Sequence, residues 1–143
     1  MSNPHYNQNY TKKDVSEILK VIKDCVKNDR YIISQNDNRK ENELFIENYK
    51  LGIDKQTDIL LHIKVEDFCH SLRNTNIGYE HETLYVFVPQ VSLPKDDIEE
   101  TVSIYTKFNI IKKRNGDRVI VISFHKANKP ADYLFDRPKE LKQ

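Results

Sequence analysis

The strongest hydrophobic pattern of the chain lies in its first quarter. Apolar residues recur there every three or four positions, which is typical of the buried face of an α-helix. Thr11 and Asp14 resemble a capping arrangement at the start of this pattern. We therefore predict an amphipathic helix over about residues 12–28. Its buried face would hold Val15, Ile18, Leu19, Ile22, Cys25 and Val26.

Weaker helical patterns follow before the middle of the chain. Residues 40–50 place Leu44, Phe45 and Tyr49 on one inward face, and the pattern ends near Gly52. Three shorter segments are also predicted: a strand over 31–34, a third helix over 56–63 and a loop near 74–78.

The second half of the chain changes to strand-forming residues. Residues 83–91, 101–111 and 118–126 are rich in β-formers, and the sequence KRNGD between the last two predicts a hairpin turn. Helices followed by strands indicate an α+β fold, with N-terminal helices packed on a C-terminal antiparallel β-sheet. We expect a single domain over 11–126, a flexible N-terminus over 1–10 and a charged C-terminal tail over 127–143 that is at most partly ordered.

The hairpin turn determines which side chains face one another. A two-residue loop at Asn115–Gly116 would scatter apolar residues over both faces. A three-residue loop over 114–116, with Gly116 left-handed and a bulge, gives one apolar face and is the register we predict. That face pairs Ile110 with Ile120, Phe108 with Ile122 and Thr106 with Phe124.

The opposite face of this hairpin gathers polar side chains. The predicted register pairs Tyr105 with His125, Lys107 with Ser123 and Asn109 with Val121. An imidazole can act as acid or base near neutral pH, and an ammonium group can stabilise a phosphate. A phenol can donate a proton or stack on a base. The cluster suits chemistry on a phosphodiester, although a solvated sheet face with an ordinary Tyr and His is the alternative.

Composition excludes several classes of protein. A chain of 143 residues is long enough for one domain with its own core. Cys25 and Cys69 form no CxxC pair, and the spacings of His62, His70 and His81 fit no common zinc pattern, so we expect neither a metal nor a cofactor. No apolar run approaches the roughly 18 residues of a membrane span, and the N-terminus lacks a signal peptide. The expected compartment is the cytoplasm.

Charge is distributed unevenly along the chain. Residues 1–100 hold 13 Lys and Arg against 18 Asp and Glu, a net −5, whereas residues 101–143 hold 10 against 4, a net +6. Such a split points weakly to an anionic partner on the basic side, and a solvated basic hairpin is the simpler alternative. The candidate RNA-binding residues are Lys107, Lys112, Lys113, Arg114 and Lys126.

Several segments, in order, resemble the MqsR toxins of the RelE-like group. The segments LGID (51–54), EDFCHSL (66–72) and YVFVP (85–89) resemble the family's LGLD, SDFYKS and DVYRP. Downstream, SIYTKFNII and VIVISFHK resemble its final hairpin, which carries a Tyr and ends in SFK. The order and approximate spacing agree over about residues 51–126, roughly half of the chain. The N-terminal helices are not covered, and the hairpin is longer than in the family.

The resemblance places family residues on particular positions of this chain. The family's Lys in SDFYKS corresponds to His70, its hairpin Tyr to Tyr105 and its final Lys to His125, with Lys126 adjacent. These are the expected catalytic residues. The family's Gln before DVY corresponds to Leu84, which cannot perform the same role. Two histidines can supply both the general base and the general acid, and their roles remain open.

The resemblance implies an mRNA-cleaving toxin that needs no metal. The ribose 2′-hydroxyl would attack the adjacent phosphate, and a cognate antitoxin protein would hold the enzyme inactive; the group also allows for ribosome association. Two alternatives remain: a catalytically inactive RNA- or protein-binding module of the same fold, and an accessory protein that binds a host factor.

Overall fold

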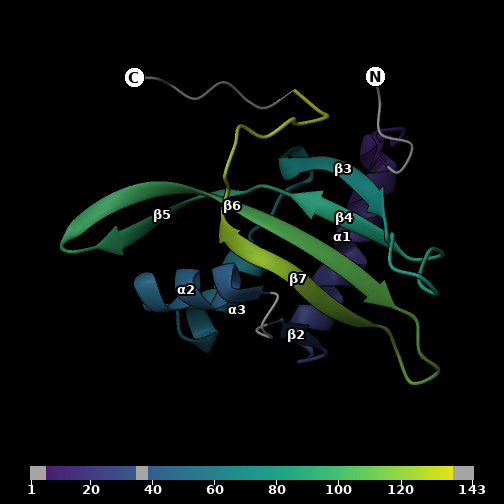
Figure 1. The fold of residues 1–143 in the computed structure, drawn as a ribbon, viewed down its shortest axis with the longest axis horizontal. Coiled ribbons are helices and arrows are strands. Elements are labelled where there is room, and N and C mark those ends of the chain that lie inside the picture. Colours follow the sequence, from purple (N-terminus) through teal and green to yellow (C-terminus); the bar gives the residue numbers. More distant parts are fainter. Residues whose placement is uncertain (1–5, 35–38, 137–143) are drawn as a thin grey trace.

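The computed structural model describes residues 6–34 and 39–136, and within them the chain forms three α-helices and one seven-stranded sheet (Figure 1). The predicted α+β class is confirmed. The helices are α1 (Lys12–Lys27), α2 (Lys40–Asn48) and α3 (Ile53–Leu61), and a 3-10 turn covers Val65–Asp67. The strands are β1 (Tyr6–Asn7), β2 (Tyr31–Ile33), β3 (Phe68–Arg73), β4 (Thr83–Phe87), β5 (Gln90–Lys95), β6 (Ile98–Ile111) and β7 (Arg118–Lys126).

The sheet is mixed rather than purely antiparallel. Its order is β1-β3-β4-β6-β7-β2, with β5 paired to the first half of β6. All pairs are antiparallel except β2 with β7. The sequence predicted a C-terminal sheet. The two edge strands β1 and β2, however, come from the N-terminal half of the chain.

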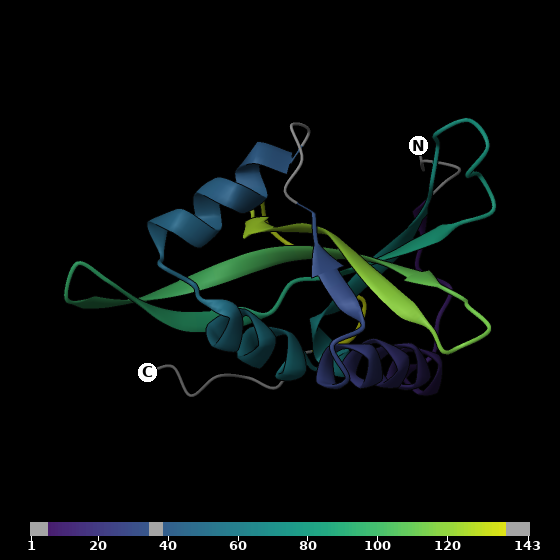
Figure 2. The ribbon, with the colours of Figure 1, turned by 90° about the horizontal axis from the view of Figure 1, so that it is seen from below.

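The helix α1 forms where its pattern predicts it. Thr11 and Asp14 make a complete capping box, which satisfies free backbone amides at the helix start. Its buried face packs with α3 against the sheet, and Figure 2 shows α1 and α3 together on one side, with α2 set apart alongside β7. Four fully buried phenylalanines fill the layer between helices and sheet: Phe68, Phe87, Phe108 and Phe124.

The helix α2 is held by one buried amide. Asn42 is fully buried, donates to the carbonyls of Ser34 and Ile122, and accepts from the amide of Phe124. It therefore occupies the edge of β7 where β2 has ended. Because Asn42 and Phe45 take the inward positions, Leu44 is 53% exposed, and its predicted inward placement is wrong.

The β6–β7 hairpin follows the predicted register only in part. Three pairs are confirmed: Tyr105 with His125, Thr106 with Phe124 and Lys107 with Ser123. A bulge then shifts the register, so the predicted pairs Phe108–Ile122, Asn109–Val121 and Ile110–Ile120 are wrong. The observed partners are Val121, Ile120 and Val119.

The bulge has a clear packing reason. It leaves Ile122 as the extra residue, which lets Val119 and Val121 face the core together with Phe124. The last strand pair is Ile111 with Arg118, so the loop spans 112–117 rather than three residues. Gly116 has a φ of 116°, the left-handed conformation that the sequence predicted for it.

The segments beyond the predicted domain also join the fold. Tyr6 and Asn7 pair with β3, and residues 127–133 cross the sheet face that α1 and α3 leave open, where Tyr133 donates to the carbonyl of Val88. Leu134 and Phe135 pack instead against the main core, and the amide of Leu134 donates to the carbonyl of Phe68. The remaining parts of the expected flexible ends, 1–5 and 137–143, lie outside the described residues.

Candidate active site

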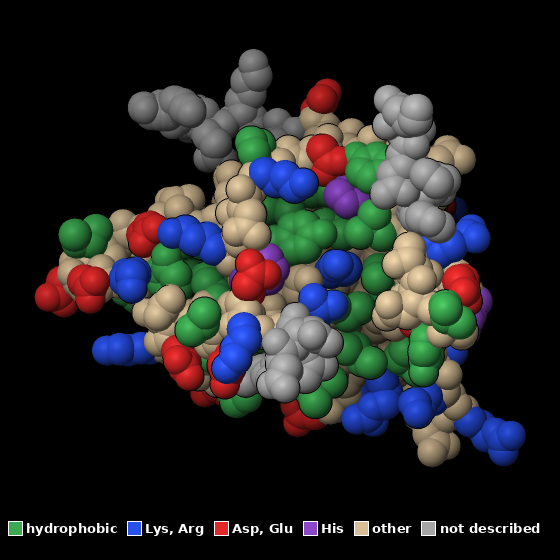
Figure 3. Space-filling view, in the orientation of Figure 1, with side chains coloured by type: hydrophobic (Ala, Val, Ile, Leu, Met, Phe, Trp, Pro, Cys, Tyr) green, Lys and Arg blue, Asp and Glu red, His purple; other side chains and the backbone are tan. Residues whose placement is uncertain are grey.

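The open face of the sheet contains a pocket of about 510 Å³. His70 on β3, Tyr105 on β6 and His125 on β7 all line it, so the structure brings the three expected catalytic side chains into one cavity. The segment 127–132 closes one side of this pocket. Figure 3 shows histidine and hydrophobic side chains around this hollow, with Lys and Arg atoms close by.

Tyr105 and His125 form the cross-strand pair of the hairpin. Their ring centroids lie 5.6 Å apart with an interplanar angle of 28°, which is a stacked arrangement. Burial raises the pKa of the Tyr105 phenol, and Cys69 adds to this shift. Tyr105 therefore keeps its proton at neutral pH and can donate a hydrogen bond into the pocket.

His125 is held from two sides. Its Nδ1 lies 2.9 Å from the carbonyl oxygen of Lys126, and its Nε2 lies 3.7 Å from the Glu41 carboxylate in the first turn of α2. The side-chain Nδ2 of Asn128 also donates to the Glu41 carboxylate. These contacts orient the His125 ring beside Tyr105.

His70 is the most buried of the three candidates. Its ring stacks on Tyr6 with centroids 4.4 Å apart, and its Nδ1 lies 3.1 Å from Oδ1 of Asp132. Burial, followed by the positive charge of Lys107, lowers the pKa of His70 to about 4. The neighbouring Asp132 carboxylate does not offset these two effects, so His70 is a neutral imidazole at pH 7 and can accept a proton.

Lys107 lies over Tyr105, and the positive charge of Arg39 acts on both residues. The Nζ of Lys107 is 6.0 Å from the Tyr105 ring centroid. Burial lowers the pKa of Lys107, and the charge of Arg39 lowers it further. The positive charge of Arg39 also lowers the pKa of Tyr105, against the larger effect of burial. Ammonium and guanidinium groups can bind a phosphate group.

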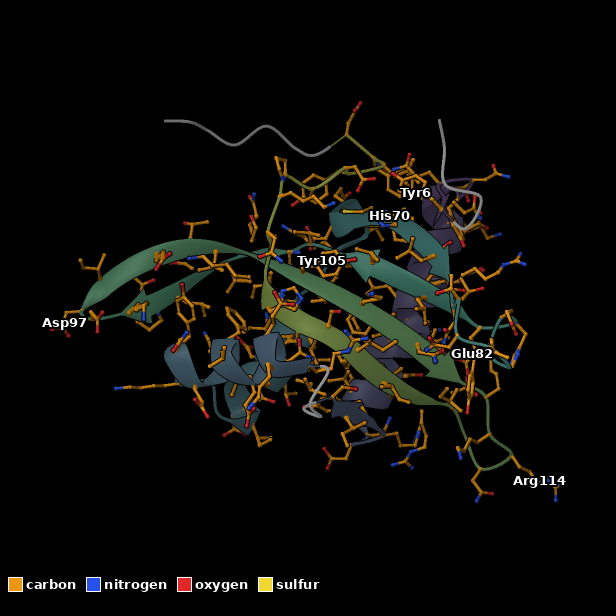
Figure 4. All side chains as sticks on the ribbon, viewed as in Figure 1. Tyr6, His70, Glu82, Asp97, Tyr105 and Arg114 are labelled. Carbon is orange, nitrogen blue, oxygen red and sulfur yellow. The ribbon has the colours of Figure 1, made fainter. Side chains whose placement is uncertain are left out.

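The other candidate RNA-binding residues do not converge on this pocket. Lys112, Lys113 and Arg114 lie in the hairpin loop, seven or more residues along the chain from Tyr105, or about 23 Å at the rise of an extended strand. Figure 4 shows Arg114 at the far end of the hairpin from Tyr105 and His70. Lys112 also forms an ion pair with Asp117, 3.2 Å away.

Lys126 is also engaged away from the pocket. Its Nζ lies 3.2 Å from Glu100, and this hydrogen bond, with a contribution from Tyr49, raises the pKa of the exposed Lys126 amine. Adjacent residues of a strand point to opposite faces, which separates Lys126 from His125.

Four residues around the pocket were not identified from the sequence. Tyr6 and Asp132 line the pocket from the N-terminus predicted to be flexible and from the predicted C-terminal tail, and Arg39 and Glu41 lie at the start of α2. None belongs to a motif or to a hydrophobic pattern. Only the tertiary structure brings them together, so no signal in the sequence marks them.

The histidines form no metal centre among the described residues. Within 6–34 and 39–136, no group of three or more His, Cys, Asp or Glu side chains is arranged to hold a metal ion. Of the three histidines considered for zinc, only His70 lines the pocket, whereas His62 is exposed and bonded to the carbonyl of Asp58. In the same part of the chain, no helix is both long enough and apolar enough to cross a membrane.

The comparisons with known proteins give no relative. No family model, no curated protein and no solved structure matches this chain.

Proposed function

We propose that this protein is a metal-independent endoribonuclease with the architecture and activity of a RelE-like, MqsR-like mRNA-cleaving toxin. The observation that supports this function most directly is the single pocket lined by His70, Tyr105 and His125. It combines a neutral imidazole, a second imidazole beside a carboxylate, and a protonated phenol. These are the groups that RNA cleavage by the 2′-hydroxyl requires.

The two histidines have different environments, which suggests different roles. The neutral His70 is the general base that removes the proton from the ribose 2′-hydroxyl. As O2′ bonds to phosphorus, the bond from phosphorus to O5′ breaks, and His125 gives its proton to the leaving oxygen. The products are a 2′,3′-cyclic phosphate and a 5′-hydroxyl. Each proton transfer contributes about 10²- to 10⁴-fold to the rate.

Lys107 and Arg39 stabilise the negative charge that develops on the phosphate oxygens. Lys107 lies over the Tyr105 ring, and the positive charge of Arg39 acts on both residues. Tyr105 donates a hydrogen bond or stacks on a base of the substrate. The basic hairpin loop extends beyond the pocket and contacts the RNA backbone farther along the strand.

The biological setting follows from the same resemblance. The substrate is single-stranded messenger RNA, free or bound to the ribosome. The regulatory partner is a cognate antitoxin protein, and the site of action is the cytoplasm.

A cleavage assay with purified protein tests this function. A single-stranded RNA labelled at its 5′ end is incubated with the protein in the presence of EDTA, and the product ends are identified. We expect cleavage with 2′,3′-cyclic phosphate ends, and a decrease of at least about 100-fold in His70→Gln and in His125→Gln. His62→Gln is the matched control because His62 is exposed and remote from the pocket. Complete loss of cleavage in EDTA, or full activity in both pocket variants, would contradict the proposal.

A second candidate function is RNA binding without cleavage. It is favoured by the position of Lys112, Lys113 and Arg114, because a basic loop remote from the pocket can bind RNA without bringing it to the histidines. Saturable binding of an RNA that stays intact over hours would favour this function. Shorter fragments that disappear with His70→Gln would exclude it.

A further inference from the structure

Two segments that are remote in the sequence meet over His70. Tyr6 comes from the short edge strand β1, and Asp132 comes from the segment that follows β7. Gln8 connects them, since its Nε2 donates to the carbonyl of Cys69 at 2.8 Å and to the carbonyl of Asp132 at 3.1 Å. Figure 4 shows Tyr6 directly beside His70. His70 is therefore fixed by contacts from outside its own strand pair.

We propose that Asp132 is the positioning residue of the pocket: it holds His70 in the tautomer with the proton on Nδ1 and so leaves Nε2 to act as the general base. The proton on Nδ1 is assigned from the contacts and the neutral state of the ring from its burial, and only the role of Nε2 in catalysis rests on the proposed function.

The hydrogen bonds of Asp132 support this assignment. An ionised carboxylate can only accept hydrogen bonds. Oδ2 accepts from the Tyr6 hydroxyl, and Oδ1 lies 3.1 Å from Nδ1 of His70. Two donors thus converge on one carboxylate, and the His70 donor is Nδ1–H. In a neutral imidazole with the proton on Nδ1, Nε2 is an acceptor.

The Tyr6 ring keeps the imidazole in this orientation. It stacks on His70 at a centroid distance of 4.4 Å, and His70 is only 9% exposed. A ring flip would place a carbon atom against Asp132 and break the hydrogen bond. Within the described part of the chain, no side chain or carbonyl is hydrogen-bonded to Nε2. This nitrogen is therefore available to a substrate.

The alternative is an ion pair between a protonated His70 and Asp132. The groups near the imidazole oppose it. Lys107 on β6 adds a positive charge, and burial disfavours a second one, so that the pKa of His70 is about 4. Tyr6 on β1, Tyr105 on β6 and Cys69 on β3 are uncharged at pH 7 and do not compensate. At neutral pH the contact is a hydrogen bond from a neutral ring.

The tautomer can be measured directly by NMR. The full-length protein is labelled with ¹⁵N-histidine, and long-range ¹H–¹⁵N spectra at pH 7 report which ring nitrogen of His70 carries the proton. We expect the Nδ1–H form in the wild type, and a population shift of at least half towards Nε2–H in Asp132→Ala. Asp136→Asn, in the same exposed segment, is the matched control and should give the wild-type spectrum.

Two further variants separate the carboxylate from the packing. Asp132→Asn keeps the shape of the side chain and should also disturb the tautomer, because an amide can donate to Nδ1. Tyr6→Phe keeps the stacked ring and removes only the hydroxyl, so His70 should retain Nδ1–H. A wild-type His70 in the Nε2–H form, or a tautomer unchanged in both Asp132 variants, would overturn the assignment.

Kinetics then distinguish this inference from the proposed function. If RNA is cleaved, Asp132→Asn should lower kcat about 10²- to 10⁴-fold with little change in KM, because a wrong tautomer removes the base but not the binding site. A wild-type protein that has the Nδ1–H tautomer but cleaves no RNA would reject the ribonuclease and leave the role of Asp132 in fixing the ring intact. Cleavage that is insensitive to Asp132→Asn would reject its positioning role in catalysis.

Discussion

The two faces of the sheet carry side chains of different kinds. The face under α1 and α3 is apolar, and its four phenylalanines are completely buried. The open face contains imidazoles, phenols, a lysine and carboxylates over a small apolar floor of Cys69, Val86 and Val88. The strands β6 and β7 contribute to both faces through the alternation of their side chains. The stability of the fold thus comes mainly from one face, and the titratable side chains of the candidate site lie on the other.

The largest expected effect comes from the covered face. Phe108→Ala should lower the free energy of unfolding by about 3–5 kcal/mol, because it opens a cavity next to Phe87. Urea denaturation followed by circular dichroism measures this loss. An equally large loss in Tyr105→Phe, on the open face, would show that the two faces do not differ in this way.

The main contribution expected from the open face is a pH dependence of the free energy of unfolding. The pKa of His70 is about 4 in the folded protein, below its ordinary value of 6.5, so the unfolded chain binds more protons between these values. Stability is therefore lost as pH falls from about 6.5 to about 4, by up to roughly 3 kcal/mol. Urea midpoints at pH 7 and pH 4 measure the change. His70→Gln should remove most of this dependence, whereas His62→Gln should retain it.

The edge of β7 beyond the end of β2 depends on Asn42 for its hydrogen bonds. Asn42→Ala should cost about 2–3 kcal/mol, because it leaves the amide of Phe124 and the carbonyl of Ile122 without partners. The same urea titration measures the loss, with the exposed Leu44→Gln on the same helix as its control. Hydrogen exchange should also increase at Phe124. A protected Phe124 amide in Asn42→Ala would contradict this account.

The smallest effects are expected from the charges. Lys107→Gln should weaken binding of a single-stranded RNA about 10-fold, because this amine lies over the Tyr105 ring, whereas Lys113→Gln in the loop should weaken it about 2- to 3-fold. Fluorescence anisotropy at several salt concentrations measures both. A larger effect of Lys113 than of Lys107 would place the main RNA contact on the hairpin loop.

Regular elements with a strong pattern could be predicted from the sequence. The periodicity of α1 and the Thr11 cap gave its bounds to within a residue, and the β6–β7 turn gave the pairing of Tyr105 with His125. The bulge at Ile122 could not be predicted, because alternating Val and Ile residues satisfy either register. Only the tighter packing of Val119 and Val121 selects the observed one.

The residues around the pocket could not be predicted from the sequence for a different reason. Asp132 and Tyr6 are 126 residues apart and belong to polar segments without periodicity. Their contact depends on where the sheet edge and the segment after β7 meet. Phe68–Leu72 of the segment EDFCHSL lie in β3, and the sequence pattern had not predicted a strand there.

The position of Asp132 has a consequence for synthesis. Translation proceeds from the N-terminus, and Asp132 is the last of the pocket-lining residues to be added. The pocket therefore stays incomplete until every strand that lines it has been made, and a chain that ends before Asp132 would lack the carboxylate that contacts His70.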